Sequence, residues 1–148
     1  MQSTEKIETV ACGETTRAAP NRIRYWLPVA LYAGIIFYLS AQSHPEEQLP
    51  SFLLRGLSDK ILHAVEYGVL ATLCYRAFRW AAGATLSSYA VLLSIVTASF
   101  YGVTDEVHQY FVPLREASVF DWMADTVGAV IAALGASRIL RHNRSHES

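Results

Sequence analysis

Four apolar runs divide the chain, and short polar or proline-containing connections separate them. The runs cover residues 25–41, 61–80, 86–111 and 119–140, and the middle of each is nearly free of charge. A helix of about 20 residues, within a range of roughly 17–25, crosses the hydrocarbon core of a bilayer. The pattern therefore predicts an all-α protein whose residues 25–140 form a four-helix transmembrane bundle.

The two ends of the chain differ from this apolar region. Residues 1–24 are polar and lack apolar periodicity, which predicts a disordered tail, and residues 141–148 form a short basic tail. Within the bundle, the short turn over residues 81–85 makes the second and third helices antiparallel neighbours. The consecutive Val112 and Pro113 end the third helix, because proline cannot continue the backbone hydrogen-bond pattern.

Composition agrees with a membrane protein. Hydrophobic residues make up 52% of the chain and charged residues 17%, which is a low charge content for a soluble domain. The formal net charge of −1 gives no reason to expect nucleic-acid binding, so the expected partner is the lipid bilayer. The oligomeric state cannot be read from the sequence.

The distribution of positive charge predicts the orientation. Nine lysines and arginines lie in the N-terminal stretch, the turn between the second and third runs, and the C-terminus, whereas three lie in the other two connections. The positive-inside rule therefore predicts that both termini are cytoplasmic and that the first and third connections face outward.

Polar side chains lie on one face of the second predicted helix near its outer end. Asp59, His63 and the pair Glu66 and Tyr67 follow one another at helical spacing. The seven residues from Asp59 to Glu66 rise by about 10 Å, so Glu66 lies below the headgroups. A lone charge near the middle of a membrane helix costs about 2.5–3.5 kcal/mol, so this face needs polar partners.

The third and fourth predicted helices supply such partners at the same end of the bundle. Asp105 and Gln109 share a face, Glu106 lies about a quarter-turn away, and Asp121 and Asp125 stack one turn apart. We therefore predict one outward-facing polar pocket. Its candidate residues are Asp59, His63, Glu66, Tyr67, Asp105, Glu106, Gln109, Arg115, Asp121 and Asp125.

Small residues recur every fourth position along the last predicted helix. They are Ala124, Gly128, Ala132 and Ala136. Such a stripe lets the backbone of a partner helix come close, so we interpret it as a packing surface.

The polar residues also form ordered motifs. These are Phe37-Tyr38-Leu39-Ser40-Ala41-Gln42-Ser43, Ser58-Asp59-Lys60-x-x-His63-x-x-Glu66-Tyr67-x-x-Leu70, Asp105-Glu106-x-x-Gln109-x-Phe111-x-Pro113-x-Arg115 and Ser118-x-x-Asp121-x-x-Ala124-Asp125-x-x-Gly128. Together they resemble the VanZ-like family over about residues 25–140. Two positions differ from the usual pattern of that family, which has Asn in place of Asp125 and Gly in place of Leu114.

The resemblance implies a small multi-pass protein of the bacterial inner (cytoplasmic) membrane. The namesake of the family is associated with low-level resistance to the glycopeptide teicoplanin. The resemblance thus implies a family and a compartment, and it does not supply a reaction.

The predicted pocket contains six carboxylates against Lys60 and Arg115, so it needs a shared proton, a bound cation or water. We interpret it first as a binding site for a cell-envelope or lipid-linked ligand that contributes to glycopeptide tolerance. No cofactor is expected. A divalent cation on His63, Glu66, Asp105 and Asp121 is the weaker alternative, because no His-x-x-x-His or Glu-x-x-His spacing occurs there.

Two other interpretations remain open. The first is an intramembrane hydrolase or transferase, with His63 or His108 as base, Asp105 or Asp121 orienting it and Arg115 holding an anion, although no nucleophile stands out. The second is a purely structural polar network, in which His63 hydrogen-bonds Asp121 and joins two helices.

Overall fold

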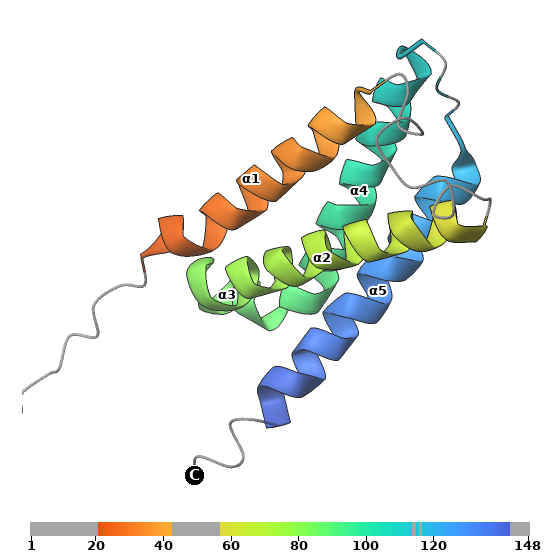
Figure 1. Cartoon of the computed structure of the whole chain (residues 1–148). Helices are drawn as coiled ribbons and strands as arrows, with labels where there is room; N and C mark the ends of the chain where they lie inside the picture. The colour runs from red at the N-terminus through yellow and green to blue at the C-terminus, as the bar shows by residue number, and fades with distance from the viewer. Residues whose placement is uncertain (1–20, 43–56, 114, 116, 143–148) are drawn as a thin grey trace, which may run out of the picture.

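The computed structural model describes residues 21–42, 57–113, 115 and 117–142, and only the backbone of residues 57–59, 141 and 142. All regular secondary structure in these residues is helical (Figure 1). The helices are α1 (Arg22–Ser40), α2 (Leu57–Ala81), α3 (Ala84–Ser88), α4 (Ala90–Tyr110) and α5 (Val119–His142). The all-α prediction is confirmed. The predictions made for residues 1–20, 43–56, 114 and 143–148 lie outside the described residues.

The first and last helices are longer than predicted. The Asn21 side chain accepts a hydrogen bond from the backbone N–H of Ile23 at 3.1 Å, so α1 begins at Arg22. This side chain satisfies an N–H group that has no partner within the helix, which is how asparagine caps a helix start. Residues 22–24 are therefore helical and not part of a disordered tail, and α5 continues to His142.

The third predicted helix is in fact two helices, α3 and α4, which are separated by a break at Tyr89. Arg79 donates to the Ser87 hydroxyl at 2.6 Å, and this hydroxyl donates to the Arg79 carbonyl at 2.9 Å. The Ser88 hydroxyl donates to the carbonyl of Thr85 at 2.6 Å. Serine side chains that bond to the nearby backbone compete with a continuous helix, which accounts for the break.

The central helix is α2, which packs against α1, α4 and α5. Tyr67, Ala71 and Cys74 on its inner face have no exposed surface. Helices α1 and α4 and the Val119–Leu140 part of α5 are long and apolar enough to cross a membrane, whereas α2 is not among these candidates. Three of the four predicted spans thus meet the composition test. The polar residues of α2 lower its hydropathy, and its neighbours cover much of its surface.

Two helices come into close contact at Gly128 of α5. A Cβ atom at this position would lie 1.9 Å from the Ala64 carbonyl oxygen of α2. One turn further, a Cβ atom at Gly68 would lie 3.3 Å from the Cβ of Ala132. The small residues therefore bring the two backbones into contact, as the stripe predicted. This contact sets the register in which the preceding turns of α2 and α5 face each other.

Aromatic residues occupy the end of the bundle where α1 begins and α2 ends. The Tyr25 and Trp80 rings stack with centroids 6.2 Å apart, and the Trp26 and Phe78 rings meet edge to face at 5.2 Å. Leu140 of α5 lines a cavity of about 520 Å³ together with Trp80. The start of α1 and the end of α5 therefore lie at the same end of the bundle, away from the predicted polar site.

Candidate functional site

Two polar pairs join α2 to α5 within their first turns. The Lys60 ammonium forms an ion pair with the Asp121 carboxylate. One turn further, Nδ1 of His63 lies 3.1 Å from Oδ1 of Asp125. The two helices run in the same direction here, so side chains at matching positions meet in successive pairs.

Helix α4 contributes three buried polar side chains to the same region. Asp105, Glu106 and Gln109 are 5%, 8% and 3% exposed. The Gln109 amide donates to Oδ2 of Asp105 at 2.9 Å, and the backbone N–H of Ser118 donates to Oε2 of Glu106 at 2.6 Å. Glu106 therefore ties the end of α4 to the residue that precedes α5.

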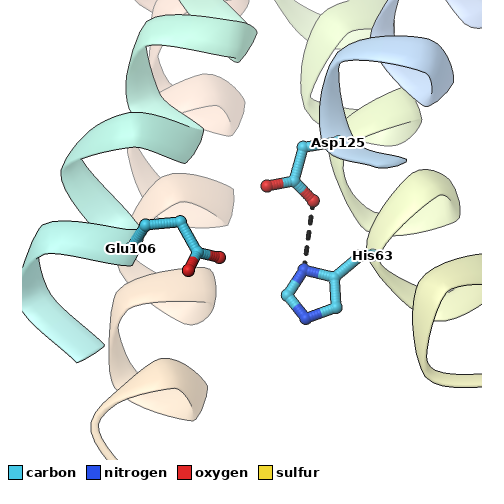
Figure 2. Close-up of side chains that lie close together, drawn as sticks. All are labelled: His63, Glu106 and Asp125. Carbon is cyan, nitrogen blue, oxygen red and sulfur yellow. Dashed lines mark hydrogen bonds and ion pairs between the residues drawn. The ribbon is translucent and has the colours of Figure 1, made fainter. Parts of the chain in front are cut away.

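Three of these residues converge on one point from three helices. One potential ligand atom from each of His63, Glu106 and Asp125 lies within 4.8 Å of the others. Figure 2 shows both carboxylates directed toward the space beside the imidazole ring. Asp125 is fully buried, and its Oδ2 has no hydrogen-bond partner among the described residues. The same holds for Oε1 of Glu106.

Further predicted site residues surround this point. Glu66 lies within electrostatic range of His63, Asp105, Asp125 and Arg115. The fully buried Tyr67 lies within electrostatic range of Glu66, Asp105 and Asp125. The structure thus places the predicted residues in one region of the bundle, except Asp59, whose side chain is not described. We call the group the polar cluster: Lys60, His63, Glu66, Tyr67, Asp105, Glu106, Gln109, Arg115, Asp121 and Asp125.

The contacts within the cluster differ from those considered from the sequence. His63 contacts Asp125, whereas Asp121, which lies one turn earlier on α5, pairs with Lys60. His108, the other histidine considered as a base, stacks on Phe37 of α1 with ring centroids 4.4 Å apart.

Two contributors were left off the list of candidate site residues. Lys60 was counted only as a positive charge of the predicted pocket, and Ser118 appeared only in a motif, although each contacts a cluster carboxylate. Their positions in the motifs could have indicated this role. Lys60 lies three residues before His63, and Ser118 lies three residues before Asp121, so each precedes a candidate residue by about one helical turn.

The potential metal ligands also differ from the expected set. The sequence analysis considered four ligands, which were His63, Glu66, Asp105 and Asp121. In the structure, the potential ligand atom of His63 lies close to those of Glu106 and Asp125 instead. Glu106 and Asp125 lie on different helices, so no residue spacing within one helix predicts that they meet.

Two cavities lie along the helices that carry the cluster, and one of them is lined by a cluster residue. An apolar groove of about 510 Å³ runs between α2 and α5, lined along α2 from Ile61 to Arg76 and along α5 from Gly128 to Ala132. A second cavity of about 300 Å³ is lined by Glu106 together with Val107, Tyr110, Phe111 and Ala117. The groove begins at the residue after Lys60, and the second cavity reaches a cluster carboxylate.

Comparison with known proteins gives one match. The model of the VanZ/LLP1 family matches residues 14–141, which include all five helices up to the penultimate residue of α5 and the whole polar cluster. No curated protein and no solved structure matches the chain. The family match and the three apolar helices together indicate a membrane protein.

Proposed function

The chain belongs to the VanZ/LLP1 family, and from this premise we propose that it is a four-span protein of the bacterial cytoplasmic membrane. Its termini are cytoplasmic and its polar cluster lies near the outer surface. The uneven distribution of lysine and arginine supports this orientation. The position of α2 among α1, α4 and α5 supports a fourth span, since a helix covered by its neighbours needs less apolar surface than one that faces lipid.

Reporter fusions test the orientation. A periplasmic-type reporter inserted after Glu47 or after Glu116 is expected to be active, and the same reporter after Ser148 is expected to be inactive. Cytoplasmic signals from both internal fusions would contradict the orientation.

Within this topology, the polar cluster binds the polar group of a cell-envelope or lipid-linked ligand, and this binding contributes to tolerance of glycopeptide antibiotics. The observation that carries the proposal is the convergence of polar side chains from α2, α4 and α5, together with an apolar groove between the same α2 and α5. Convergent polar groups next to an apolar surface are typical of ligand sites.

The groove suits the chain of an amphiphilic ligand. The fifteen residue steps from Ile61 to Arg76 rise by about 22 Å, which exceeds one leaflet of a bilayer core of about 30 Å and is about three quarters of the whole core. Val65 and Val69, which line it, are 58% and 41% exposed. A hydrocarbon chain in this groove would place its polar end beside Lys60 and Asp121.

The charge of the cluster limits the chemistry of the polar group. Among the described side chains, five carboxylates face Lys60 and Arg115, so negative charge is in excess. A ligand rich in hydroxyl or amine donors therefore fits better than a bare anion. Sugars and amine-bearing peptides linked to membrane lipids have this chemistry.

Mass spectrometry of lipids that co-purify with the full chain tests the proposal. The wild-type protein is expected to retain an amphiphile that Val69→Trp loses, because the indole fills the groove. Val96→Trp is the matched control, since Val96 is 54% exposed on α4 and does not line the groove. In a glycopeptide-sensitive host, expression of the wild type and of Val96→Trp is expected to raise the inhibitory concentration of teicoplanin, and Val69→Trp is not. Equal lipid retention by both variants would contradict the proposal.

A hydrolase or transferase is the second candidate, and the contact between His63 and Asp125 favours it. A carboxylate that orients an imidazole is the usual arrangement of a general base. Incubation of the purified protein with the co-purified lipid tests this candidate. Conversion that His63→Gln abolishes would favour an enzyme, whereas unchanged lipid would favour a binding protein.

A further inference from the structure

The convergence of His63, Glu106 and Asp125 has a more specific consequence than a polar environment. Their potential ligand atoms lie within 4.8 Å of one another, and each residue comes from a different helix. Ligands of a cation bonded at about 2.0–2.2 Å lie on the order of 3–4.4 Å apart, so small side-chain rotations are enough to close this group around one ion.

The burial of the carboxylates points to a ligand. Asp125 has no exposed surface and Glu106 is 8% exposed, yet Oδ2 of Asp125 and Oε1 of Glu106 have no donor among the described residues. A buried charged oxygen without a partner is costly. The second oxygen of each carboxylate is already used, since Asp125 contacts His63 and Glu106 accepts from the Ser118 backbone. Both carboxylates are directed toward the space beside the imidazole ring (Figure 2).

We propose that His63, Glu106 and Asp125 bind one divalent transition-metal cation, Zn²⁺ or Mn²⁺. One imidazole nitrogen with two carboxylate oxygens suits these ions better than Mg²⁺ or Ca²⁺, which prefer oxygen ligands throughout. The double charge of the ion balances the two carboxylates. Three protein ligands leave a coordination position for water or for a group of a bound molecule.

One contact from outside the ligand set holds a ligand in place. The Ser118 N–H donates to Oε2 of Glu106. Such an outer contact orients a metal ligand and tunes its affinity. The site stands on these three residues and does not depend on the proposed envelope ligand.

Metal analysis of the purified full chain tests the site. The protein carries an affinity tag without histidine, is stripped with a chelator, and is then dialysed against micromolar ZnCl₂ or MnCl₂. Elemental mass spectrometry is expected to find close to one ion per chain. Glu106→Gln and Asp125→Asn keep the shape of the side chains, and each is expected to weaken binding at least about tenfold, since changes beyond the ligand shell already cost 10–100-fold.

Asp121→Asn is the matched control. This substitution removes a negative charge from α5 one turn before Asp125, at a carboxylate that pairs with Lys60. It is expected to keep the ion, and Val69→Trp is expected to keep it as well, which separates the metal site from the lipid groove. X-ray absorption of the zinc-loaded wild type is expected to show nitrogen and oxygen ligands at about 2.0–2.2 Å.

Three results would overturn the proposal. A stripped wild-type protein that takes up no stoichiometric Zn²⁺ or Mn²⁺ would show that protons, and not a metal, balance the carboxylates. Uptake by Glu106→Gln and Asp125→Asn equal to that of the wild type would place the ion elsewhere. Equal weakening in Asp121→Asn would indicate attraction by net charge without specific ligands. The wild-type measurements decide the question even where a variant fails to accumulate.

Discussion

The contact between α2 and α5 has two parts that are held together in different ways. In the first turns, Lys60 pairs with Asp121 and His63 contacts Asp125, so the helices meet through long polar side chains. From Ala64 and Gly128 onward they meet through small residues, and their backbones touch. The same pair of helices is therefore polar at one end and closely packed over the next turns, at Gly68 and Gly128.

The difference indicates a division of labour. In a membrane, apolar side chains gain little by leaving lipid for protein, so close van der Waals packing stabilises the pair. Buried ion pairs, by contrast, contribute little net stability because desolvation offsets their attraction. We infer that the small residues hold the helices in register and that the polar part is kept for binding. Three predictions test this comparison.

The largest effect is expected from Gly128→Ala. The added Cβ would meet the Ala64 carbonyl oxygen at 1.9 Å, so α2 and α5 must separate. We expect a loss of about 3 kcal/mol of stability or more, because the clash is with a backbone atom, and thermal or denaturant unfolding in detergent measures it.

Gly135→Ala is the control for this change. Gly135 lies on the same helix and has no neighbouring atom within 4 Å of the added carbon. Its replacement is expected to leave stability unchanged or to raise it by up to about 1 kcal/mol, because alanine favours a helix. Equal losses in the two variants would refute the role assigned to the small residues.

An intermediate effect is expected from His63→Ala. Asp125 is fully buried and would lose the group that contacts its Oδ1, which costs about 1–3 kcal/mol. Replacing both His63 and Asp125 by alanine is expected to cost less than the sum of the single changes, because the double variant leaves no unpartnered buried carboxylate. Strict additivity in unfolding experiments would show that the two side chains do not interact.

The smallest effect is expected from Lys60→Gln. The Lys60 side chain is 43% exposed, and exposed ion pairs contribute about 0–1 kcal/mol. We expect unfolding to change by less than about 1 kcal/mol, with a weaker dependence on salt, while retention of the co-purified amphiphile falls. A loss as large as that of Gly128→Ala would reverse the comparison, since the polar end would then carry the stability.

Much of the architecture follows from local sequence patterns. The apolar runs predicted the helical class and the positions of most helices, because a segment of apolar residues must satisfy its backbone hydrogen bonds internally. The positions of Gly128 and Ala132 predicted a close helix contact. The break at Tyr89 was missed, because it depends on hydrogen bonds between Ser87 and Arg79, which belong to different helices.

The sequence by itself determined which polar residues lie together at one end of the bundle, since helical periodicity and chain direction fix their position along each helix and their face. The tertiary structure decided which of them meet. The partner of His63 is Asp125 because Gly128 sets the register of α5 against α2, and Glu106 turns inward because Ser118 binds its carboxylate. Contacts between helices depend on rotations and shifts that no spacing within one helix records.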